Sequence, residues 1–408
     1  MLHGIVGLLA LLALAWGLSE DRWRVPFRTV LSGVALQILL ALLMTHTPLA
    51  AAFFGALSRG VQALQAATDA GTGFVFGYLG GGRLPFAETE AGASFIFAFR
   101  ALPLVLVISA LASLFFYWGI LQRIVQGFAW VLRRVMGIGG PLGLGAASHI
   151  FVGMIEAPLL IRPYLARMER GDLFALMSCG LAGIAGSVMV LYATILGPII
   201  PDALGNILIA SVISTPAALA VAALMVPFPA NPAPARYEPP GDPPANALDA
   251  IAKGTGDGIT ILLNIIAVLI VAIALVTLIN AGLAGVSDSL SLQGILAYPF
   301  RPILWLIGIP WGETEVAARL MATKTVLNEF VAYVDLARLD AGSLSPRSRL
   351  IMTYALCGFA NFGSLGILVG GLTAMVPERK ADIARLGLRA LVAGTLATCM
   401  SGAVIGML

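Results

Sequence analysis

The sequence predicts an all-α integral membrane protein with about eight transmembrane helices, interfacial helices and two re-entrant hairpins arranged as inverted repeats. Three observations predict this class. Hydrophobic residues make up 59% of the 408-residue chain and charged residues only 11%, against about 25% charged in a soluble protein. Apolar runs of about 20 residues, long enough to cross a bilayer, recur along the chain. Two other apolar stretches contain an acidic residue and helix-breaking Gly or Pro, which an ordinary span avoids.

The apolar runs that qualify as spans cover approximately residues 1–18, 29–48, 93–120, 173–199, 203–226, 259–286, 349–375 and 384–407. The first run lacks a basic leading segment and a small-residue cleavage site, so we expect a retained span rather than a signal peptide. Segments 49–70 and 121–136 have helical spacing with Arg or Gln on one side. This pattern predicts two helices that lie in the membrane interface.

Residues 138–163 and 310–340 fit neither a span nor a loop. Both are largely apolar, contain Gly or Pro, and carry an acidic residue, Glu156 or Glu329 respectively. A carboxylate at membrane depth costs about 2.5–3.5 kcal/mol on insertion scales, so it is expected to face a partner, a cavity or a substrate. The two segments therefore predict re-entrant hairpins whose acidic tips meet at one site in mid-bilayer. A poor span or a buried interfacial helix is the alternative for each.

The hairpins begin a pattern that occurs twice. Each is followed by a polar loop and then by a Gly-rich interruption of an apolar run, at residues 179–187 and 357–364. Matched, interrupted segments in two halves of a chain are typical of transporters with inverted repeats, and they mark the substrate site. Eight prolines in residues 227–244 predict an extended linker between the halves.

The charge distribution predicts that the N-terminus lies outside the cell. With that topology most Arg and Lys residues between spans lie inside, although Arg338, Arg347 and Arg349 do not. The net charge of +3 includes no basic run, so no nucleic-acid partner is predicted. The three cysteines have no metal-ligand spacing, and we predict buried thiols, with no metal and no cofactor.

Catalysis and channel conduction are the competing function classes. His149 with Ser148 or Ser187 could be imagined as a catalytic pair, but no Gly-x-Ser-x-Gly, His-Glu-x-x-His or Asp pair lies in a span. The sequence therefore does not predict an enzyme. A channel would need a repeated pore-lining filter, whereas broken, unequal hairpins favour alternating access.

Several segments, in their order along the chain, resemble the concentrative nucleoside transporters. They are Gly71–Gly77, Glu156–Leu159, Gly186–Val188, Leu306–Trp311, Lys324–Tyr333 and Cys357–Phe362. The motif Asn-Glu-Phe-Val-Ala-Tyr at 328–333 is the most specific of them. The resemblance implies a homotrimeric, multi-pass symporter of the cell inner membrane, with membrane lipid around it. A scaffold would hold a mobile, elevator-type transport domain that carries nucleoside across.

The resemblance also implies a division of the chain. Residues 1–120 would form scaffold spans and an interfacial helix, 121–226 the first transport-domain repeat with hairpin 1, 227–250 the linker, 251–300 an interfacial helix and a scaffold span, and 301–408 the second transport-domain repeat with hairpin 2.

The family's ribose contacts fall on Glu329, Asn361 and Ser364, which are the expected residue types. A carboxylate accepts hydrogen bonds from sugar hydroxyls, while an amide and a hydroxyl can both donate and accept. A buried site of this kind would reject a deoxy analogue by leaving polar groups unpaired. Lys324, five residues before Glu329, is expected either to neutralise a carboxylate or to cap backbone carbonyls.

The residues expected near the base depart from the family's pattern. The family usually has a Gln and a small hydroxyl residue before the hairpin glutamate, whereas Met154 and Ile155 precede Glu156 here, with Val188 on the opposite helix. Polar reading of the base edge is thereby largely removed, although Met154 could pack on a base face. The base preference is therefore not predicted, and a modified nucleoside or nucleoside-like molecule is the alternative substrate.

The expected ion site departs as well. The family's sodium ligands have counterparts at His149, Val152, Gly183 and Ile184. The family commonly has Asn and Ser side chains at the first and third of these positions, so both side-chain oxygens are missing here. An imidazole has an unperturbed pKa near 6.5. We therefore predict proton coupling, with His149, Glu156 or Glu329 as the proton-binding group, and sodium coupling is the alternative.

Overall fold

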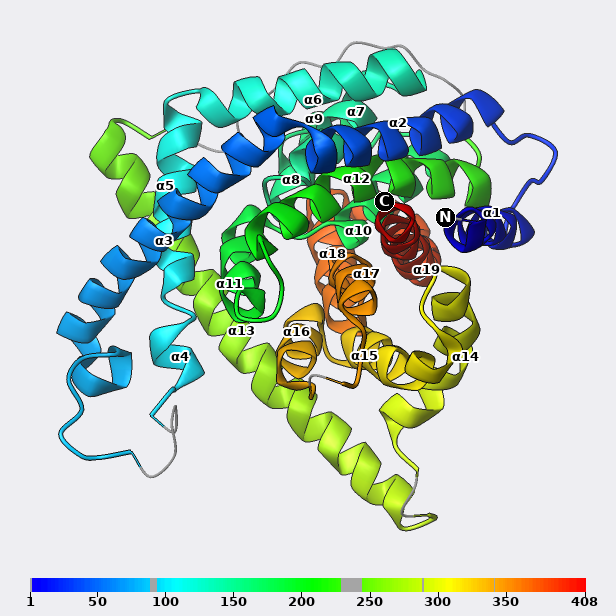
Figure 1. Ribbon diagram of the computed structural model, residues 1–408. Helices are drawn as coiled ribbons and strands as arrows, with labels where there is room; N and C mark the ends of the chain where they lie inside the picture. The colour runs from blue at the N-terminus through cyan, green and yellow to red at the C-terminus, as the bar shows by residue number, and fades with distance from the viewer. Residues whose placement is uncertain (1, 89–93, 229–243, 288–289, 341) are drawn as a thin grey trace.

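The computed structural model describes residues 2–88, 94–228, 244–287, 290–340 and 342–408. All regular elements in these ranges are helices, so the predicted all-α class is confirmed (Figure 1). Five helical stretches in these ranges are long and apolar enough to cross a membrane. They are α2 (Phe27–His46), Phe97–Tyr117 with α4 (Phe97–Arg100) and α5 (Leu104–Tyr117), α12 (Ala203–Met225), α13 (Ala247–Ala284), and Pro377–Met407 with α19 (Lys380–Met407).

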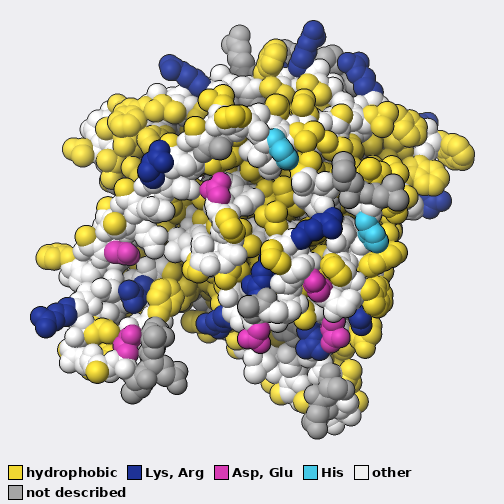
Figure 2. Space-filling model, in the orientation of Figure 1, with side chains coloured by type: hydrophobic (Ala, Val, Ile, Leu, Met, Phe, Trp, Pro, Cys, Tyr) yellow, Lys and Arg dark blue, Asp and Glu magenta, His cyan; other side chains and the backbone are white. Residues whose placement is uncertain are grey.

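The other predicted spans are shorter or interrupted. One is α1 (Leu2–Gly17), and the two others are broken helices, α10 (Arg170–Ala182) with α11 (Gly186–Leu196) and α17 (Pro346–Leu356) with α18 (Phe362–Met375). Both predicted breaks are confirmed, whereas the total number of spans stays a prediction. Hydrophobic side chains spread widely over the visible surface, as a membrane-embedded protein requires (Figure 2).

The buried centre of the molecule is formed by α12 and α19. In the most apolar 18-residue stretch of each of these two helices, 94% and 83% of the residues are buried inside the protein. Small side chains, such as Ala217, Ala218 and Ala220 of α12, let neighbouring backbones approach closely. The helices α1, α2, α10 and α17 pack around this pair.

A second pair, α5 and α13, lies at the edge of the molecule, and only 6% of the apolar window of α13 is buried (Figure 1). Gly254 allows the two helices to touch, because a Cβ there would lie 2.6 Å from the carbonyl oxygen of Ser109. The helix α13 begins twelve residues before the expected 259, since Asn246 caps it by accepting the Asp249 N–H. Of the predicted linker 227–250, residues 229–243 lie outside the described residues, and residues 247–250 belong to α13.

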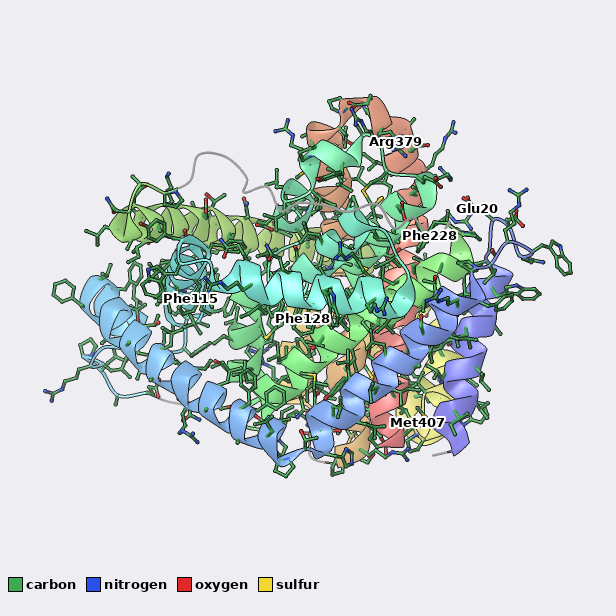
Figure 3. The ribbon with its side chains drawn as sticks, turned by 90° about the horizontal axis from the view of Figure 1, so that it is seen from above. Glu20, Phe115, Phe128, Phe228, Arg379 and Met407 are labelled. Atoms are coloured by element: carbon green, nitrogen blue, oxygen red, sulfur yellow. The ribbon has the colours of Figure 1, made fainter. Side chains whose placement is uncertain are left out.

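The two predicted interfacial segments are helical. The first is longer than expected, because α3 extends over Pro48–Phe76, and the second is α6 (Ile120–Met136). The buried residues of α6 are Val125, Ala129, Leu132 and Met136, which share one face. Seen from above, α6 lies across the bundle and carries Phe128 (Figure 3). The Phe128 ring lies 5.6 Å from that of Phe151 in hairpin 1.

Both hairpins have the predicted helix–turn–helix form, although their depth in a bilayer stays a prediction. Hairpin 1 consists of α7 (Gly140–Ser148), α8 (Glu156–Leu159) and α9 (Arg162–Leu165). Hairpin 2 consists of α15 (Thr314–Val326) and α16 (Glu329–Arg338), and α14 (Leu292–Leu306) packs against it.

The two broken helices meet at their breaks. The backbone N–H of Phe359 donates to the carbonyl of Gly183 at 3.1 Å. Gly358 permits this approach, because a Cβ there would lie 2.9 Å from the Ala182 carbonyl oxygen. The turn of hairpin 1 joins the crossing, where the Gly186 N–H donates to the Phe151 carbonyl at 3.2 Å. Backbone groups freed by the breaks thus find partners inside the protein.

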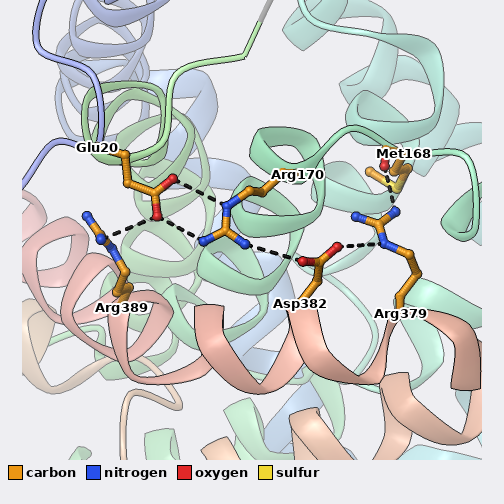
Figure 4. A network of polar contacts seen from close by, with 6 residues as sticks. All are labelled: Glu20, Met168, Arg170, Arg379, Asp382 and Arg389. Carbon is orange, nitrogen blue, oxygen red and sulfur yellow. Dashed lines mark hydrogen bonds and ion pairs between the residues drawn. The ribbon is translucent and has the colours of Figure 1, made fainter.

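An ionic network ties the start of α10 and α19 to the connection between α1 and α2. Its residues are Glu20, Met168, Arg170, Arg379, Asp382 and Arg389 (Figure 4). Arg170 bonds Glu20 at 2.9 Å and Asp382 at 3.4 Å, and Arg379 donates to the Met168 carbonyl at the end of hairpin 1. The Glu20 and Arg170 side chains are 30% and 38% exposed, so we expect about 0–1 kcal/mol from their pair.

Glu20→Gln is expected to lower the free energy of unfolding by about 0.5–1 kcal/mol at pH 7. The hydrogen bond from Arg170 holds the pKa of Glu20 below its ordinary value, so Glu20 stabilises the fold above the unfolded-state pKa of about 4.3. This contribution is lost as the pH falls through the folded-state pKa. Thermal unfolding in detergent between pH 7 and pH 3 measures it.

The control for this measurement is Glu315→Gln, which removes a more exposed ion pair with Arg319. We expect it to change stability less than Glu20→Gln does. A stability difference for Glu20→Gln that stayed constant over the whole pH range would contradict the assignment.

Candidate functional site

Glu329 is the first residue of α16, at the turn of hairpin 2. Asn328 starts the helix there, because its side chain accepts the Val331 N–H at 3.0 Å. The carboxylate thus lies at a helix N-terminus, where the helix dipole favours negative charge. Only 4% of Glu329 is exposed, so its charge depends on partners within the protein.

Both oxygens of the Glu329 carboxylate accept a hydrogen bond. Tyr192 Oη donates to Oε1 at 2.7 Å, and Asn361 Nδ2 donates to Oε2 at 3.0 Å. Asn361 Oδ1 in turn accepts the backbone N–H of Ser364 at 2.7 Å and caps α18. All four residues are at least nine-tenths buried. The structure therefore brings together Glu329, Asn361 and Ser364, the residues on which the family resemblance places the sugar contacts.

Sequence reasoning missed Tyr192. It lies on α11, in the other half of the chain from Glu329, and is 3% exposed. A signal was present, because Tyr192 follows the predicted site residue Val188 by four positions and so shares its helix face.

Lys324 is completely buried on α15. Its Nζ donates to the Ala355 carbonyl at 2.8 Å and to Thr398 Oγ1 at 3.2 Å. Ala355 lies in the last turn of α17, where a cation is favoured by the free carbonyls. Of the two expected roles, capping of carbonyls is the direct one. No hydrogen bond joins Lys324 to Glu329 among the residues that the structure describes.

Glu156 has a different environment from Glu329. It is exposed at the start of α8, and its carboxylate lies against Gly153, where a Cβ would be 2.1 Å from Oε2. In the described part of the chain, no hydrogen bond joins Glu156 to Glu329, Asn361 or Ser364. The structure thus gathers a polar cluster around one hairpin glutamate and leaves the other at the surface.

Of the residues expected near the base, Met154 and Ile155 lie beside the two broken helices, and Val188 lies on one of them, in α11. Ile155 Cδ1 lies 2.2 Å from where a Cβ on Gly371 of α18 would be. The Cβ of Met154 lies 3.5 Å from where a Cβ on Gly180 of α10 would be. Val188 is 7% exposed. These side chains offer dispersion contact and no strong hydrogen-bonding group.

The residues expected at the ion site lie around the end of α10. A Cβ on Gly183 would be 3.5 Å from the His149 carbonyl oxygen and 3.7 Å from Ser211 Oγ. Both His149 Nε2 and Ser211 Oγ are buried and lack a hydrogen-bond partner among the described residues. Ile184 is buried and Val152 is half-buried. These residues thus offer carbonyl oxygens, one imidazole and one hydroxyl.

Three family models together match most of the chain. "Na+ dependent nucleoside transporter N-terminus" matches residues 6–79, "Nucleoside recognition" matches 98–199, and "Na+ dependent nucleoside transporter C-terminus" matches 206–406. An uncharacterized transporter of Haemophilus influenzae is 38% identical, over 100% of this chain and 97% of its own. Rat sodium/nucleoside cotransporter 1 is 34% identical, over 100% of this chain and 64% of its own.

Solved structures are similar over the full length. The structure of CNTnw in an inward-facing, substrate-bound state has a TM-score of 0.89 at 37% identity, covering 100% of this chain and 97% of that one. A CNTnw variant in an outward-facing state has a TM-score of 0.91 at 36% identity, with the same coverage.

Lys324→Met is expected to lower the free energy of unfolding by about 2–3 kcal/mol, since it removes two buried hydrogen bonds from a charged donor. Denaturation in detergent measures the change. Lys253→Met is the control, because Lys253 is 47% exposed in a surface ion pair with Asp249. Equal stabilities for the two variants would show that the Lys324 contacts contribute nothing.

Proposed function

The chain belongs to the concentrative nucleoside transporter family, in its bacterial form, and from this membership we propose that it takes up nucleosides by cation-coupled symport across the inner membrane. As a member of this family it is a multi-pass membrane transporter and not an enzyme. The observation that carries the proposed substrate is the buried cluster of Glu329, Asn361 and Ser364. An apolar protein keeps such a cluster where a polar solute must bind.

The sugar of the nucleoside is held by this cluster. Each carboxylate oxygen of Glu329 has two lone pairs. One lone pair of Oε1 accepts from Tyr192, and one of Oε2 accepts from Asn361. The remaining lone pairs can accept from two sugar hydroxyls. The Ser364 hydroxyl and the second N–H of the Asn361 amide provide further polar groups beside them.

The base is held by apolar contact with Met154, Ile155 and Val188. These side chains distinguish poorly between hydrogen-bonding patterns on a base edge, because specificity of that kind needs matching polar groups. A modified nucleoside or a nucleoside-like molecule is therefore the second candidate substrate.

The coupling ion is a proton. His149 and Gly183 provide neither of the side-chain oxygens that a hard cation such as sodium favours. His149 Nε2 is instead buried, with no hydrogen-bond partner in the described ranges, and lies 3.4 Å from where a Cβ on Gly180 would be. Glu156 and Glu329 are the other candidate proton-binding groups. Sodium coupling, which the name of the rat relative states for that protein, is the alternative.

The transport cycle is an elevator movement within a homotrimer surrounded by lipid. The helices α5 and α13 pack most extensively on each other and touch the rest of the bundle mainly through α6, α11 and α14, as a scaffold against a mobile domain would. The exposed apolar side of α13 is suited to contact with lipid or with another copy. The expected division placed residues 1–120 in the scaffold, but α1 and α2 pack on α19 and α12, which argues for moving them to the transport domain.

Glu329→Gln is expected to weaken nucleoside binding by about 10- to 100-fold, because a neutral amide replaces the charged acceptor. Calorimetric titration with a panel of purine, pyrimidine and modified nucleosides measures it. Glu315→Gln, on the same hairpin but in an exposed ion pair, is the control and should bind normally. Unchanged affinity in Glu329→Gln would refute the proposed site.

In proteoliposomes, uptake is expected to follow a pH gradient and to ignore a sodium gradient. The double variant His149→Asn, Gly183→Ser restores both family oxygens and should make uptake sodium-dependent. Ser fits at 183, since its Cβ would meet neighbouring atoms at ordinary distances of 3.5 Å or more. Uptake by the wild type that followed sodium alone would end the proton proposal.

A further inference from the structure

Tyr192 connects the two halves of the chain at the proposed sugar site. It lies on α11 in the first half, whereas Glu329 and Asn361 lie on α16 and at the start of α18 in the second. Its hydroxyl and the Asn361 amide approach the Glu329 carboxylate at different oxygens. The carboxylate is therefore held from both halves at once.

A glutamate carboxylate needs such restraint, because rotation about its last torsion has no sharp preference. A hydrogen bond to each oxygen fixes the plane of the group. Each oxygen then keeps one free lone pair in a set direction. Two acceptors in fixed directions suit a vicinal diol, which offers two O–H donors. A sugar with only one of these hydroxyls would leave one of the two acceptors without a donor.

Tyr192 can impose this orientation because it is itself held. Its ring packs 5.2 Å from the Tyr333 ring and 6.2 Å from the Phe330 ring, between centroids. The Phe330 ring packs in turn 4.4 Å from that of Phe97 on α4, outside both hairpins. Swinging the Tyr192 hydroxyl away would break this packing and leave a buried polar group unpaired.

We propose that Tyr192 is a positioning residue that orients the Glu329 carboxylate and thereby makes binding depend on both vicinal hydroxyls of the sugar. The proposal rests on the proposed function, in which Glu329 binds the sugar. It differs from a packing role, since packing would affect ribonucleosides and their deoxy analogues equally.

The test is Tyr192→Phe, which keeps the ring and removes only the hydroxyl. Affinity is measured calorimetrically for uridine or adenosine, whichever the wild type binds more tightly, and for its 2′-deoxy and 3′-deoxy analogues. We expect the ribonucleoside to bind about tenfold more weakly, as the loss of one charge-assisted hydrogen bond implies. The analogues should lose less, so the ratio of ribonucleoside to deoxynucleoside affinity should fall by roughly threefold or more.

Tyr333→Phe is the matched control. Tyr333 is a buried tyrosine in ring contact with Tyr192, but its hydroxyl donates to the Thr353 carbonyl at 2.8 Å rather than to Glu329. This variant reports the effect of losing a buried hydroxyl nearby and should leave the affinity ratio unchanged.

An unchanged ratio in Tyr192→Phe, or an equal change in Tyr333→Phe, would overturn the inference. Glu329→Gln distinguishes this failure from a failure of the proposed function. If Glu329→Gln weakens binding and Tyr192→Phe leaves the ratio unchanged, only the role of Tyr192 is wrong. If Glu329→Gln binds as the wild type does, the sugar site itself is wrong.

Discussion

The contact between the two helix breaks is the constraint on which the rest of this structure depends. A helix interrupted inside an apolar protein leaves backbone N–H and carbonyl groups that water cannot satisfy. Here the Phe359 N–H donates to the Gly183 carbonyl, so one break provides the donor and the other the acceptor. Gly358 makes the approach possible, because any side chain there would press on Ala182. The position of Asn361, three residues after Gly358, and hence of its amide beside Glu329, follows from this crossing.

The buried charges are arranged around the same crossing. Glu329 lies at the N-terminus of α16 with donors on both oxygens, and the ammonium group of Lys324 reaches from α15 to the C-terminal end of α17. Each charge is thus placed at the helix end that stabilises it. Burial of a charge is tolerated only with such compensation. The arrangement leaves the remaining lone pairs of Glu329 as the acceptors available to a ligand.

The site combines one end that matches the family with two regions that do not. The groups proposed to bind the sugar are the residue types that the family resemblance implies, whereas Met154 and Ile155 differ from the types it implies near the base, and His149 and Gly183 from those it implies near the ion. Affinity in such a site would come from the hydroxyl-binding end, where polar groups are buried and directional. The apolar end adds contact area with little selectivity. If the proposed site is right, this division makes specificity depend on the orientation of the Glu329 carboxylate.

The sequence by itself determined the membrane class, both hairpins, both helix breaks and the candidate residues Glu329, Asn361 and Ser364. The class, the hairpins, the breaks and Glu329 follow from local composition, because apolar length, Gly and Pro interruptions and isolated acidic residues act within one segment. Asn361 and Ser364 came from the resemblance of their motif to the family. Only the tertiary structure decided that Tyr192 bonds Glu329, that Lys324 caps α17, and that Glu156 lies exposed while Glu329 is buried. Those contacts join residues on different helices, and Tyr192 is 137 positions from Glu329. Helical periodicity specifies which face a side chain occupies, but the partner it meets depends on how separate helices cross.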